Sequence, residues 1–281
     1  MQQKERVKNV KKIIAVASGK GGVGKSTVAV NLALALAKTG AKVGLLDADV
    51  YGPSQPLMLN AKGERPVVKD GRLSPIIRHG LQSMSIGYLV GEVDPMVWRG
   101  PMIGKALQQL IHDTDWDALD YMVVDLPPGT GDIQLTLCQK ITLNGVVMVT
   151  TPQDLALADV MRACEMFAKL SIPILGVVEN MSIHHCSQCG HEENIFGAGG
   201  GDKLAKRYEV DMLGAIPLDR HIREMTDGGN PTVVQAPDSA YAKAFITIAE
   251  KVVAKLAEQP KDYSGIFPKV KVEFKGSDET G

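Results

Sequence analysis

The sequence has no apolar run long enough to cross a membrane. Its richest apolar stretch, residues 28–37, is interrupted by Asn31 and falls short of the ~18 residues that a membrane span needs. The basic segment 1–12 precedes an apolar run at 13–17, which is shorter than the minimum of about 7 residues for the apolar part of a signal peptide. We therefore expect a cytoplasmic protein that does not act at a membrane.

The chain also lacks an excess of charge and is poor in cysteine. Among 281 residues, 31 Lys and Arg balance 32 Asp and Glu, so the net charge of −1 gives no reason to expect a nucleic-acid partner. Without an export signal, the 4 cysteines are expected to bind metal or to pack in the core rather than to form disulfides.

Short β-branched runs alternate with helical patterns along the chain. We expect strands at 12–18, 42–47, 81–86, 121–126, 145–150, 174–179 and 212–216, and long helices at 25–39, 154–170 and 238–256. Several strands are apolar throughout, which is typical of parallel strands covered on both faces. The pattern predicts a doubly wound α/β fold, with a mostly parallel sheet of about seven to eight strands and helices on both faces.

The expected domain organisation is simple. A basic extension, 1–11, precedes a single domain at 12–258, and a polar, lysine-rich tail follows at 259–281. A hairpin at 67–73, turning at Asp70-Gly71, is expected at the edge of the sheet.

A glycine-rich stretch directly follows the first expected strand and opens the first expected helix. The pattern G-x-x-x-x-G-K-[ST] of a P-loop is matched by Gly19, Lys20, Gly21, Gly22, Val23, Gly24, Lys25 and Ser26. Glycines let backbone N–H groups converge on phosphate oxygens, and the helix N-terminus adds the positive end of its dipole. We expect Lys25 to reach the β- and γ-phosphates of ATP, and Ser26 to place its hydroxyl on Mg²⁺.

Acidic residues follow at the strand ends where a phosphate-hydrolysing site needs them. Asp47 and Asp49 come at the carboxyl end of the second strand, and Asp125 ends the apolar strand 121–126. Asp125 is expected to act on Mg²⁺ through water, as a Walker-B carboxylate. One such Asp can equally be a helix cap, but the two strand ends together favour a metal–nucleotide site. The segment 129–131, which follows two prolines, is expected to respond to the γ-phosphate as a switch.

Lys20 gives the loop the pattern K-G-G-x-G-K-[ST], and the sequence thereby resembles the deviant-Walker (SIMIBI-type) ATPases, the group of MinD, ParA and the nitrogenase iron protein. Within that group, residues 10–256 resemble the Mrp/ApbC family of iron–sulfur cluster carriers. The matching stretches are 18–27, 46–54 (LDADVYGPS), 98–102 (WRGPM), 123–136, 150–154, 176–182, 186–190, 195–201 and 214–219.

The resemblance implies a homodimer that binds and slowly hydrolyses ATP. It also implies that the dimer holds a [4Fe–4S] cluster at its interface, receives it from iron–sulfur scaffold donors and transfers it to recipient apoproteins. Lys20 is then expected to reach the nucleotide of the partner subunit, and Asp49 to orient the attacking water, so that the catalytic residues are Lys20, Lys25 and Asp49. The other nucleotide contacts that it implies are Thr27, Asn180 at the adenine, and Pro217 and Asp219 beside the base.

Cys186 and Cys189 form a C-x-x-C pair in the loop 184–191. Two such thiolates can bind one metal ion or cluster, but a cubane cluster or a tetrahedral thiolate site needs four. A two-fold dimer supplies the missing pair, which matches the bridging cluster that the resemblance implies. Two alternatives remain open: Cys186, Cys189 and His191 bind zinc, or the pair binds no metal.

The other two cysteines, Cys138 and Cys164, lie on apolar segments and are expected to pack in the core. Ser187 stands where members of the family commonly carry proline, which alters the stiffness of the loop but not the number of ligands.

Other functions fit the sequence less well. A dehydrogenase needs G-x-G-x-x-G and a ribose-binding acid, and a thioredoxin-like site needs a helix that starts at the C-x-x-C. A nitrogenase-type iron protein carries a cysteine near the third strand, and 81–91 has none. A MinD/ParA-like positioning ATPase with a structural zinc site is the main alternative, although the tail 261–281 lacks the apolar helical stripe that would bind a membrane.

Overall fold

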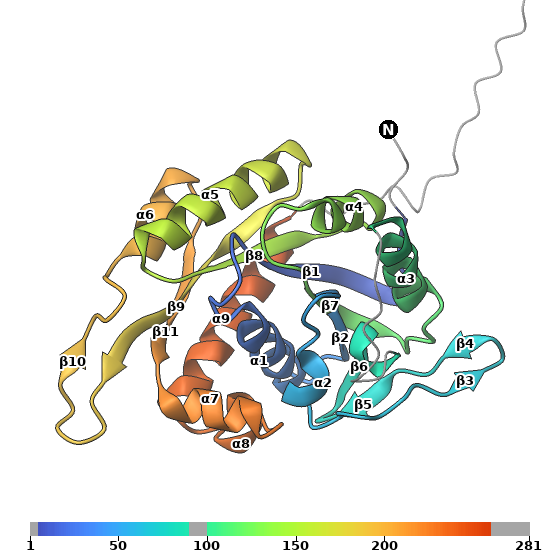
Figure 1. Ribbon diagram of the computed structural model, residues 1–281, viewed down its shortest axis with the longest axis horizontal. Helices are drawn as coiled ribbons and strands as arrows, with labels where there is room; N and C mark the ends of the chain where they lie inside the picture. Colours follow the sequence, from blue (N-terminus) through green and yellow to red (C-terminus); the bar gives the residue numbers. More distant parts are fainter. Residues whose placement is uncertain (1–4, 90–99, 260–281) are drawn as a thin grey trace, which may run out of the picture.

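The computed structural model describes residues 5–89 and 100–259 (Figure 1). The strands are β1 (Val10–Ser18), β2 (Val43–Asp47), β3 (Val68–Lys69), β4 (Arg72–Leu73), β5 (Ile76–Arg78), β6 (Leu81–Ser85), β7 (Leu119–Asp125), β8 (Gly145–Thr150), β9 (Ile174–His185), β10 (Glu192–Glu193) and β11 (Met212–Leu218). The helices are α1 (Lys25–Lys38), α2 (Gln55–Met58), α3 (Gly100–His112), α4 (Asp132–Lys140), α5 (Asp154–Lys169), α6 (Gly200–Arg207), α7 (Arg220–Asp227), α8 (Thr232–Gln235) and α9 (Ala240–Glu258), with a 3-10 turn at Ile86–Tyr88.

One sheet of nine strands organises this part of the chain. Its order is β10-β9-β8-β1-β7-β2-β6-β5, and β11 also pairs with β9. All of the pairings among β1, β2, β6, β7, β8, β9 and β11 are parallel, whereas β5 and β10 pair antiparallel at the two ends of the order. The predicted doubly wound, mostly parallel α/β fold is confirmed.

Helices cover both faces of the sheet (Figure 1). On one face α3, α4, α5 and α6 enclose a core that includes Met148 of β8, and on the other α1 and α9 enclose a core that includes Val149. Successive residues of an interior strand therefore enter different cores, which explains why β8 is buried along its whole length and reads as a continuous apolar run. None of the helices in the described ranges is long and apolar enough to span a membrane.

The helix boundaries follow from their caps. Gly40, at φ 87°, donates its N–H to Ala37 O and so closes the end of α1. Ser239 caps α9 by accepting a hydrogen bond from the N–H of Ala242, so this helix begins two residues after the expected position 238.

The hairpin predicted at 67–73 forms around Asp70-Gly71, but it does not belong to the edge of the main sheet. β3 and β4 form a separate two-stranded sheet, and the strand at the edge of the main sheet is β5. β5 turns into β6 through His79 and Gly80, both with positive φ, a turn that joins antiparallel strands tightly. We did not predict this second turn, because only its glycine is a usual turn residue.

The strand predicted at 174–179 is also longer than expected. β9 continues past a register shift against β11 to His185, and Met181 lies in the bulged segment with φ 55°. β10 then pairs back onto His184 and His185. The result is a hairpin at the end of the sheet, which carries the C-x-x-C pair.

The chain ends lie only partly within the described residues. In the segment predicted as an extension, Glu5 bridges to Ile141, Val7 is buried, and β1 begins at Val10, two residues before the expected start. The tail predicted at 259–281, except residue 259, lies outside the described residues, as do Trp98 and Arg99 of the WRGPM stretch.

Candidate functional site

The candidate phosphate site lies where three neighbouring strands end. β7 pairs on one side with β1 and on the other with β2, and the register places Asp125 opposite both Val16 and Asp47. The loop 19–24 leaves β1 at this edge and leads directly into α1. The topology therefore brings the P-loop and the acidic strand ends together, as parallel strands require.

The conformation of the loop explains its glycines. Gly22 and Gly24 have φ values of 81° and 80°, which side chains other than glycine rarely adopt. Gly19 serves a different purpose, because a Cβ there would lie 2.2 Å from the backbone carbonyl carbon of Asp159 in α5. The first glycine thus permits the loop to pass against α5, and the later ones permit its curvature into α1.

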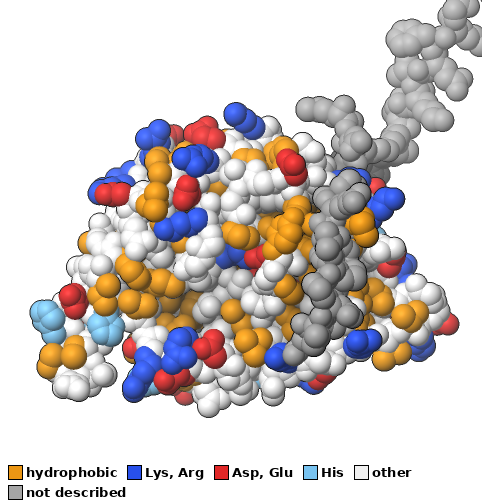
Figure 2. Space-filling view, in the orientation of Figure 1, with side chains coloured by type: hydrophobic (Ala, Val, Ile, Leu, Met, Phe, Trp, Pro, Cys, Tyr) orange, Lys and Arg blue, Asp and Glu red, His pale blue; other side chains and the backbone are white. Residues whose placement is uncertain are grey.

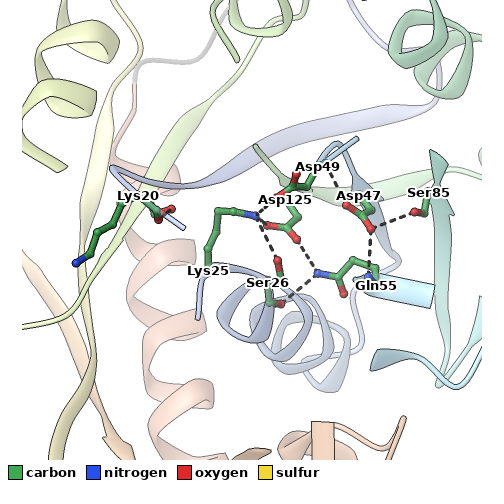
Figure 3. A network of polar contacts seen from close by, with 9 residues as sticks. Lys20, Lys25, Ser26, Asp47, Asp49, Gln55, Ser85 and Asp125 are labelled. Carbon is green, nitrogen blue, oxygen red and sulfur yellow. Dashed lines mark hydrogen bonds and ion pairs between the residues drawn. The ribbon is translucent and has the colours of Figure 1, made fainter. Parts of the chain in front are cut away.

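Lys25 lies among the acidic side chains of the site (Figure 3). Its ammonium group forms a short ion pair with Asp125, lies 3.7 Å from Asp49 Oδ2 and donates to Ser26 Oγ at 3.2 Å. Lys25 and Asp125 are both buried, so their ion pair is shielded from solvent. The structure brings together the predicted residues Lys25, Ser26, Asp49 and Asp125.

A second set of contacts joins Asp47 to the start of α2. Asp47 Oδ2 accepts hydrogen bonds from the Gln55 backbone N–H at 3.1 Å and from Ser85 Oγ at 3.0 Å, and Asp47 Oδ1 accepts from the Asp49 N–H. The Gln55 side chain donates from Nε2 to Asp125 Oδ2 and to the Ser26 carbonyl. Asp47 is thus the residue that anchors the loop after β2.

Burial shifts the pKa values of the carboxyl groups in this site. Desolvation, followed by repulsion from Asp125, raises the pKa of Asp47 to about 7. Burial also raises the pKa of Asp49, although attraction to Lys25 opposes the shift. Even with a proton on Asp47, the two carboxyl groups of Asp49 and Asp125 face the single ammonium group of Lys25, which favours a cation as a further occupant.

The geometry fits a magnesium nucleotide. A cavity of about 240 Å³ is lined by residues that include Lys20, Gly21, Gly22, Gly24, Lys25, Ser26, Thr27 and Asp49, with Pro128 just before the predicted switch segment. The Ser26 hydroxyl and the Asp125 carboxylate would hold Mg²⁺, since both offer the oxygen donors that this ion prefers. Ser54 also lines the cavity, and its buried Oγ has no hydrogen-bond partner among the described residues, which indicates that the site is completed by something it binds.

Lys20 points away from the Lys25 cluster (Figure 3). Its ammonium group lies 3.4 Å from Gln153 Oε1, and the residue is half-buried. Ser18 Oγ donates to the Lys20 carbonyl at 2.8 Å and so fixes the backbone at the loop's entrance. Lys20 is thus placed on a different side of the loop from Lys25, and the predicted contact with a partner subunit remains a prediction.

Asn180 has a structural contact that the sequence did not suggest. Its Nδ2 donates to the Val23 carbonyl at 2.9 Å, and a Cβ on Gly24 would lie 2.1 Å from the same atom. Asn180 thus ties β9 to the P-loop, while the Val23 side chain is buried in the core. The predicted contact of Asn180 with adenine remains a prediction.

Pro217 ends β11 together with Leu218, and Asp219 caps α7. Asp219 accepts hydrogen bonds from the His221 N–H at 2.7 Å and from Tyr241 Oη at 2.6 Å. Burial alone would raise the pKa of Asp219, but the bonds from Tyr241 and His221 outweigh it and lower the pKa. Neither residue lines the phosphate cavity, so their predicted place beside the base remains untested.

The C-x-x-C pair lies in the turn between β9 and β10. The Cys186 N–H donates to His191 O, and the N–H of Gly190, at φ 71°, donates to Cys186 O, both at 2.9 Å. Cys186 is half-buried and Cys189 is exposed. Hydrogen bonds from the backbone of Gln188 and Cys189 lower the pKa of the Cys186 thiol, which favours the thiolate that binds metal.

Within the described residues, no group of three or more His, Cys, Asp or Glu side chains converges to hold a metal ion. The alternative in which His191 completes a zinc site with Cys186 and Cys189 of the same chain thus has no support from the geometry. Cys138 and Cys164 are buried, as predicted, and burial raises the pKa of the Cys164 thiol to about 12.

Two polar residues of the site, Gln55 and Ser85, were not predicted from the sequence. Gln55 lies one residue beyond the matched stretch 46–54, and Ser85 ends a strand with no recognised motif. The one available indication was the position of Gln55 beside Pro56 at a helix start, which says nothing about its side-chain partners.

A P-loop between a central strand and a helix, with acidic residues ending the adjoining strand β7 and the next strand β2, defines the chain as a P-loop NTPase. A family model described as "ParA: NUBPL iron-transfer P-loop NTPase" matches residues 9–253. The chain belongs to this family, and the resemblance predicted from the sequence is confirmed.

Curated relatives cover most of the chain. It is 56% identical over 259 residues to the "iron-sulfur cluster carrier protein" of Escherichia coli K12, an alignment that covers 90% of this chain and 70% of that protein. It is 48% identical over 263 residues to the mouse "iron-sulfur cluster transfer protein NUBPL", covering 93% of this chain and 82% of that protein.

Solved structures show the same fold. A nucleotide-binding protein of Archaeoglobus fulgidus in complex with ADP is 38% identical and superposes with a TM-score of 0.74, covering 85% of this chain and 94% of that one. The cell division ATPase MinD of Pyrococcus furiosus is 26% identical and superposes with a TM-score of 0.63, covering 86% of this chain and 98% of that one.

Proposed function

We propose that the protein is a cytoplasmic ATPase that carries an iron–sulfur cluster and transfers it to recipient apoproteins. It binds Mg·ATP in the P-loop cavity and hydrolyses it slowly. Two subunits hold one [4Fe–4S] cluster between their C-x-x-C pairs, and scaffold proteins supply the cluster. The names of the curated relatives support the carrier role.

The observation that carries the proposal is the position of the C-x-x-C pair. Cys186 and Cys189 lie in the exposed turn of a hairpin, whereas Cys138 and Cys164 are buried in the core. One chain therefore offers two accessible thiols to a cluster that takes four. A second copy related by two-fold symmetry supplies the other two, and the exposed turn leaves the cluster open to a recipient.

The assignment of nucleotide roles rests on the Lys25 cluster. Lys25 binds the phosphates, Ser26 and Asp125 hold Mg²⁺, and Asp49, 3.7 Å from the Lys25 ammonium group, orients the attacking water. Lys20 reaches the nucleotide bound by the partner subunit. The nucleotide bound by the chain itself is also contacted by Thr27, Asn180, Pro217 and Asp219.

The test is anaerobic reconstitution of the full chain with iron and sulfide, followed by iron analysis, visible absorbance and determination of the mass in solution. We expect a coloured dimer that saturates near four iron atoms per dimer. The loaded dimer should transfer its cluster to an acceptor protein such as a cluster-free ferredoxin. A colourless protein that retains tightly bound zinc and no iron would contradict the carrier role and favour the positioning ATPase with a structural zinc site.

A further inference from the structure

Gln55 connects three parts of the phosphate site. It is the first residue of α2, and its side chain is almost completely buried. Its Nε2 donates to Asp125 Oδ2 at 2.9 Å and to the Ser26 carbonyl at 3.1 Å, while its backbone N–H donates to Asp47 Oδ2 at 3.1 Å (Figure 3). One residue thus contacts the end of β7, the P-loop and the end of β2.

The two oxygens of Asp125 have different partners. Lys25 binds Oδ1, and Gln55 binds Oδ2. If Lys25 moved to the phosphates of a nucleotide, its bond to Asp125 would lengthen or break, and the bond from Gln55 would remain to orient the carboxylate. The same amide group also holds the backbone of Ser26, the other predicted magnesium ligand.

A neutral amide suits this position chemically. The site already contains Asp47, Asp49 and Asp125 around one lysine, so a carboxylate at position 55 would add repulsion and a second cation would compete with Mg²⁺. An amide donates two hydrogen bonds without altering the charge. Its remaining atom, Oε1, is buried without a partner among the described residues.

We propose that Gln55 is a positioning residue of the magnesium site: it holds Asp125 and Ser26 in the arrangement that binds Mg²⁺ beside the nucleotide. The inference rests on the proposed binding of Mg·ATP and adds a residue that acts through two metal ligands. Groups that orient metal ligands commonly contribute about 10- to 100-fold to metal affinity.

The test compares Gln55→Met with Gln82→Met. Methionine keeps the length of the side chain and removes both amide groups. Gln82 is a matched control, because it is a buried glutamine on β6 whose amide bonds Asp117 and not a predicted magnesium ligand: Nε2 donates to Asp117 Oδ2 at 3.3 Å, and Oε1 accepts from the Asp117 N–H. The Gln55 backbone bond to Asp47 is present in either variant, so α2 keeps that anchor.

The measurement uses fluorescent N-methylanthraniloyl-ADP bound to the full chain, first with EDTA and then in a titration with Mg²⁺. For Gln55→Met we expect a Mg²⁺ midpoint raised about tenfold, with the metal-free affinity for the nucleotide unchanged within about twofold. Gln82→Met should keep the midpoint of the natural chain. The thermal unfolding midpoint of each protein, recorded without ligands, reports on folding separately.

Each outcome decides one question. An unchanged Mg²⁺ midpoint in a folded Gln55→Met protein would overturn the inference, as would an equal shift in Gln82→Met. If Gln55→Met does not fold, Gln55→Asn replaces it in the test, because it shortens the side chain by one methylene and withdraws the amide from Asp125. This variant must also raise the Mg²⁺ midpoint, or the inference is wrong. A natural chain that binds the probe without any effect of Mg²⁺ would instead contradict the proposed function.

Discussion

Asp47 and Asp125 are register partners on the neighbouring parallel strands β2 and β7, and both side chains are completely buried. Each is the last residue of its strand. Lys25 pairs with Asp125, whereas Asp47 is held by hydrogen bonds from Gln55, Ser85 and Asp49. The charge of Asp125 is thus stabilised by an ion pair, whereas neutral donors hold the Asp47 carboxyl group in place.

The first prediction concerns the pH dependence of stability. The folded protein keeps a proton on Asp47, whose pKa is raised to about 7, that the unfolded chain releases near 3.8. The contribution of Asp47 to the free energy of unfolding is therefore complete below about pH 4 and is lost as the pH rises to about 7. Urea unfolding at pH 5 and pH 8 should show Asp47→Asn gaining stability relative to the natural chain at the higher pH.

Asp120→Asn serves as the control for this measurement. The bond from Lys11 lowers the pKa of Asp120, which is therefore ionised in both the folded and the unfolded state across that range, so its effect on stability should not change between the two pH values. An Asp47→Asn effect that is equally constant would refute the assigned protonation.

The second prediction separates nucleotide binding from hydrolysis. Lys25→Ala should nearly abolish ATP binding, and because it leaves Asp125 buried without its ion pair, it should also cost about 3 to 5 kcal/mol of stability. Asp49→Asn should bind ATP almost normally and hydrolyse it more slowly, since it acts on the nucleophile. Equal losses of affinity in the two variants, measured by calorimetry, would show that this division of roles is wrong.

The third prediction concerns the packing of the P-loop. Gly19→Ala places a methyl group against the backbone of Asp159 and should displace the loop from α5, lowering both stability and nucleotide affinity. Gly21→Ala is the control, because the nearest atom to its Cβ, in Pro128, is 4.0 Å away. Thermal unfolding without nucleotide should distinguish them, and similar midpoints for both would argue against the close approach of Gly19 to α5.

The fourth prediction tests whether Lys20 acts on the partner subunit. Lys20→Ala should lower hydrolysis while each subunit still binds ATP. A heterodimer of Lys20→Ala with Lys25→Ala contains one subunit that binds ATP and a partner that retains Lys20, so part of the activity should return. Turnover by purified heterodimers that stays at the level of the Lys20→Ala homodimer would exclude the shared site.

The fifth prediction assigns the cluster ligands. Cys186→Ser and Cys189→Ser should each lose stable cluster binding and keep their affinity for ATP, because the hairpin and the P-loop are separate sites. Cys138→Ala and Cys164→Ala should keep the cluster and lose about 1 kcal/mol of stability each, since both thiols are buried. Iron content after anaerobic reconstitution checks all four variants, and a cluster that survives loss of Cys189 but not of Cys138 would point to an internal site.

Much of the architecture was predictable because each interior strand has two covered faces. The uninterrupted apolar runs of β7 and β8, with helices between them, leave few alternatives to a parallel sheet. The P-loop was predictable because its conformation is determined by a few consecutive residues. The positive φ values at positions 22 and 24 favour glycine, so Gly22 and Gly24 are visible in the sequence as a motif.

Other features depend on contacts between distant segments. The extension of β9 beyond residue 179 requires β10 and β11 as partners, and the residues from 180 to 185 are not apolar throughout. The contact of Asn180 with Val23 joins positions 157 residues apart, and the bonds of Gln55 depend on which side chains meet at the strand ends. Periodicity in the sequence carries no information about such pairs.

The hairpin that carries Cys186 and Cys189 has a thermodynamic consequence. Its turn is closed by the chain's own backbone bonds, between Cys186 and His191 and between Gly190 and Cys186, and its stem continues a strand of the main sheet. In a zinc finger, the free energy of binding metal is also the free energy of folding, so loss of the metal unfolds the domain. Because these backbone bonds are independent of metal–thiolate bonds, we expect the chain to keep its fold when the proposed cluster is bound, released and bound again.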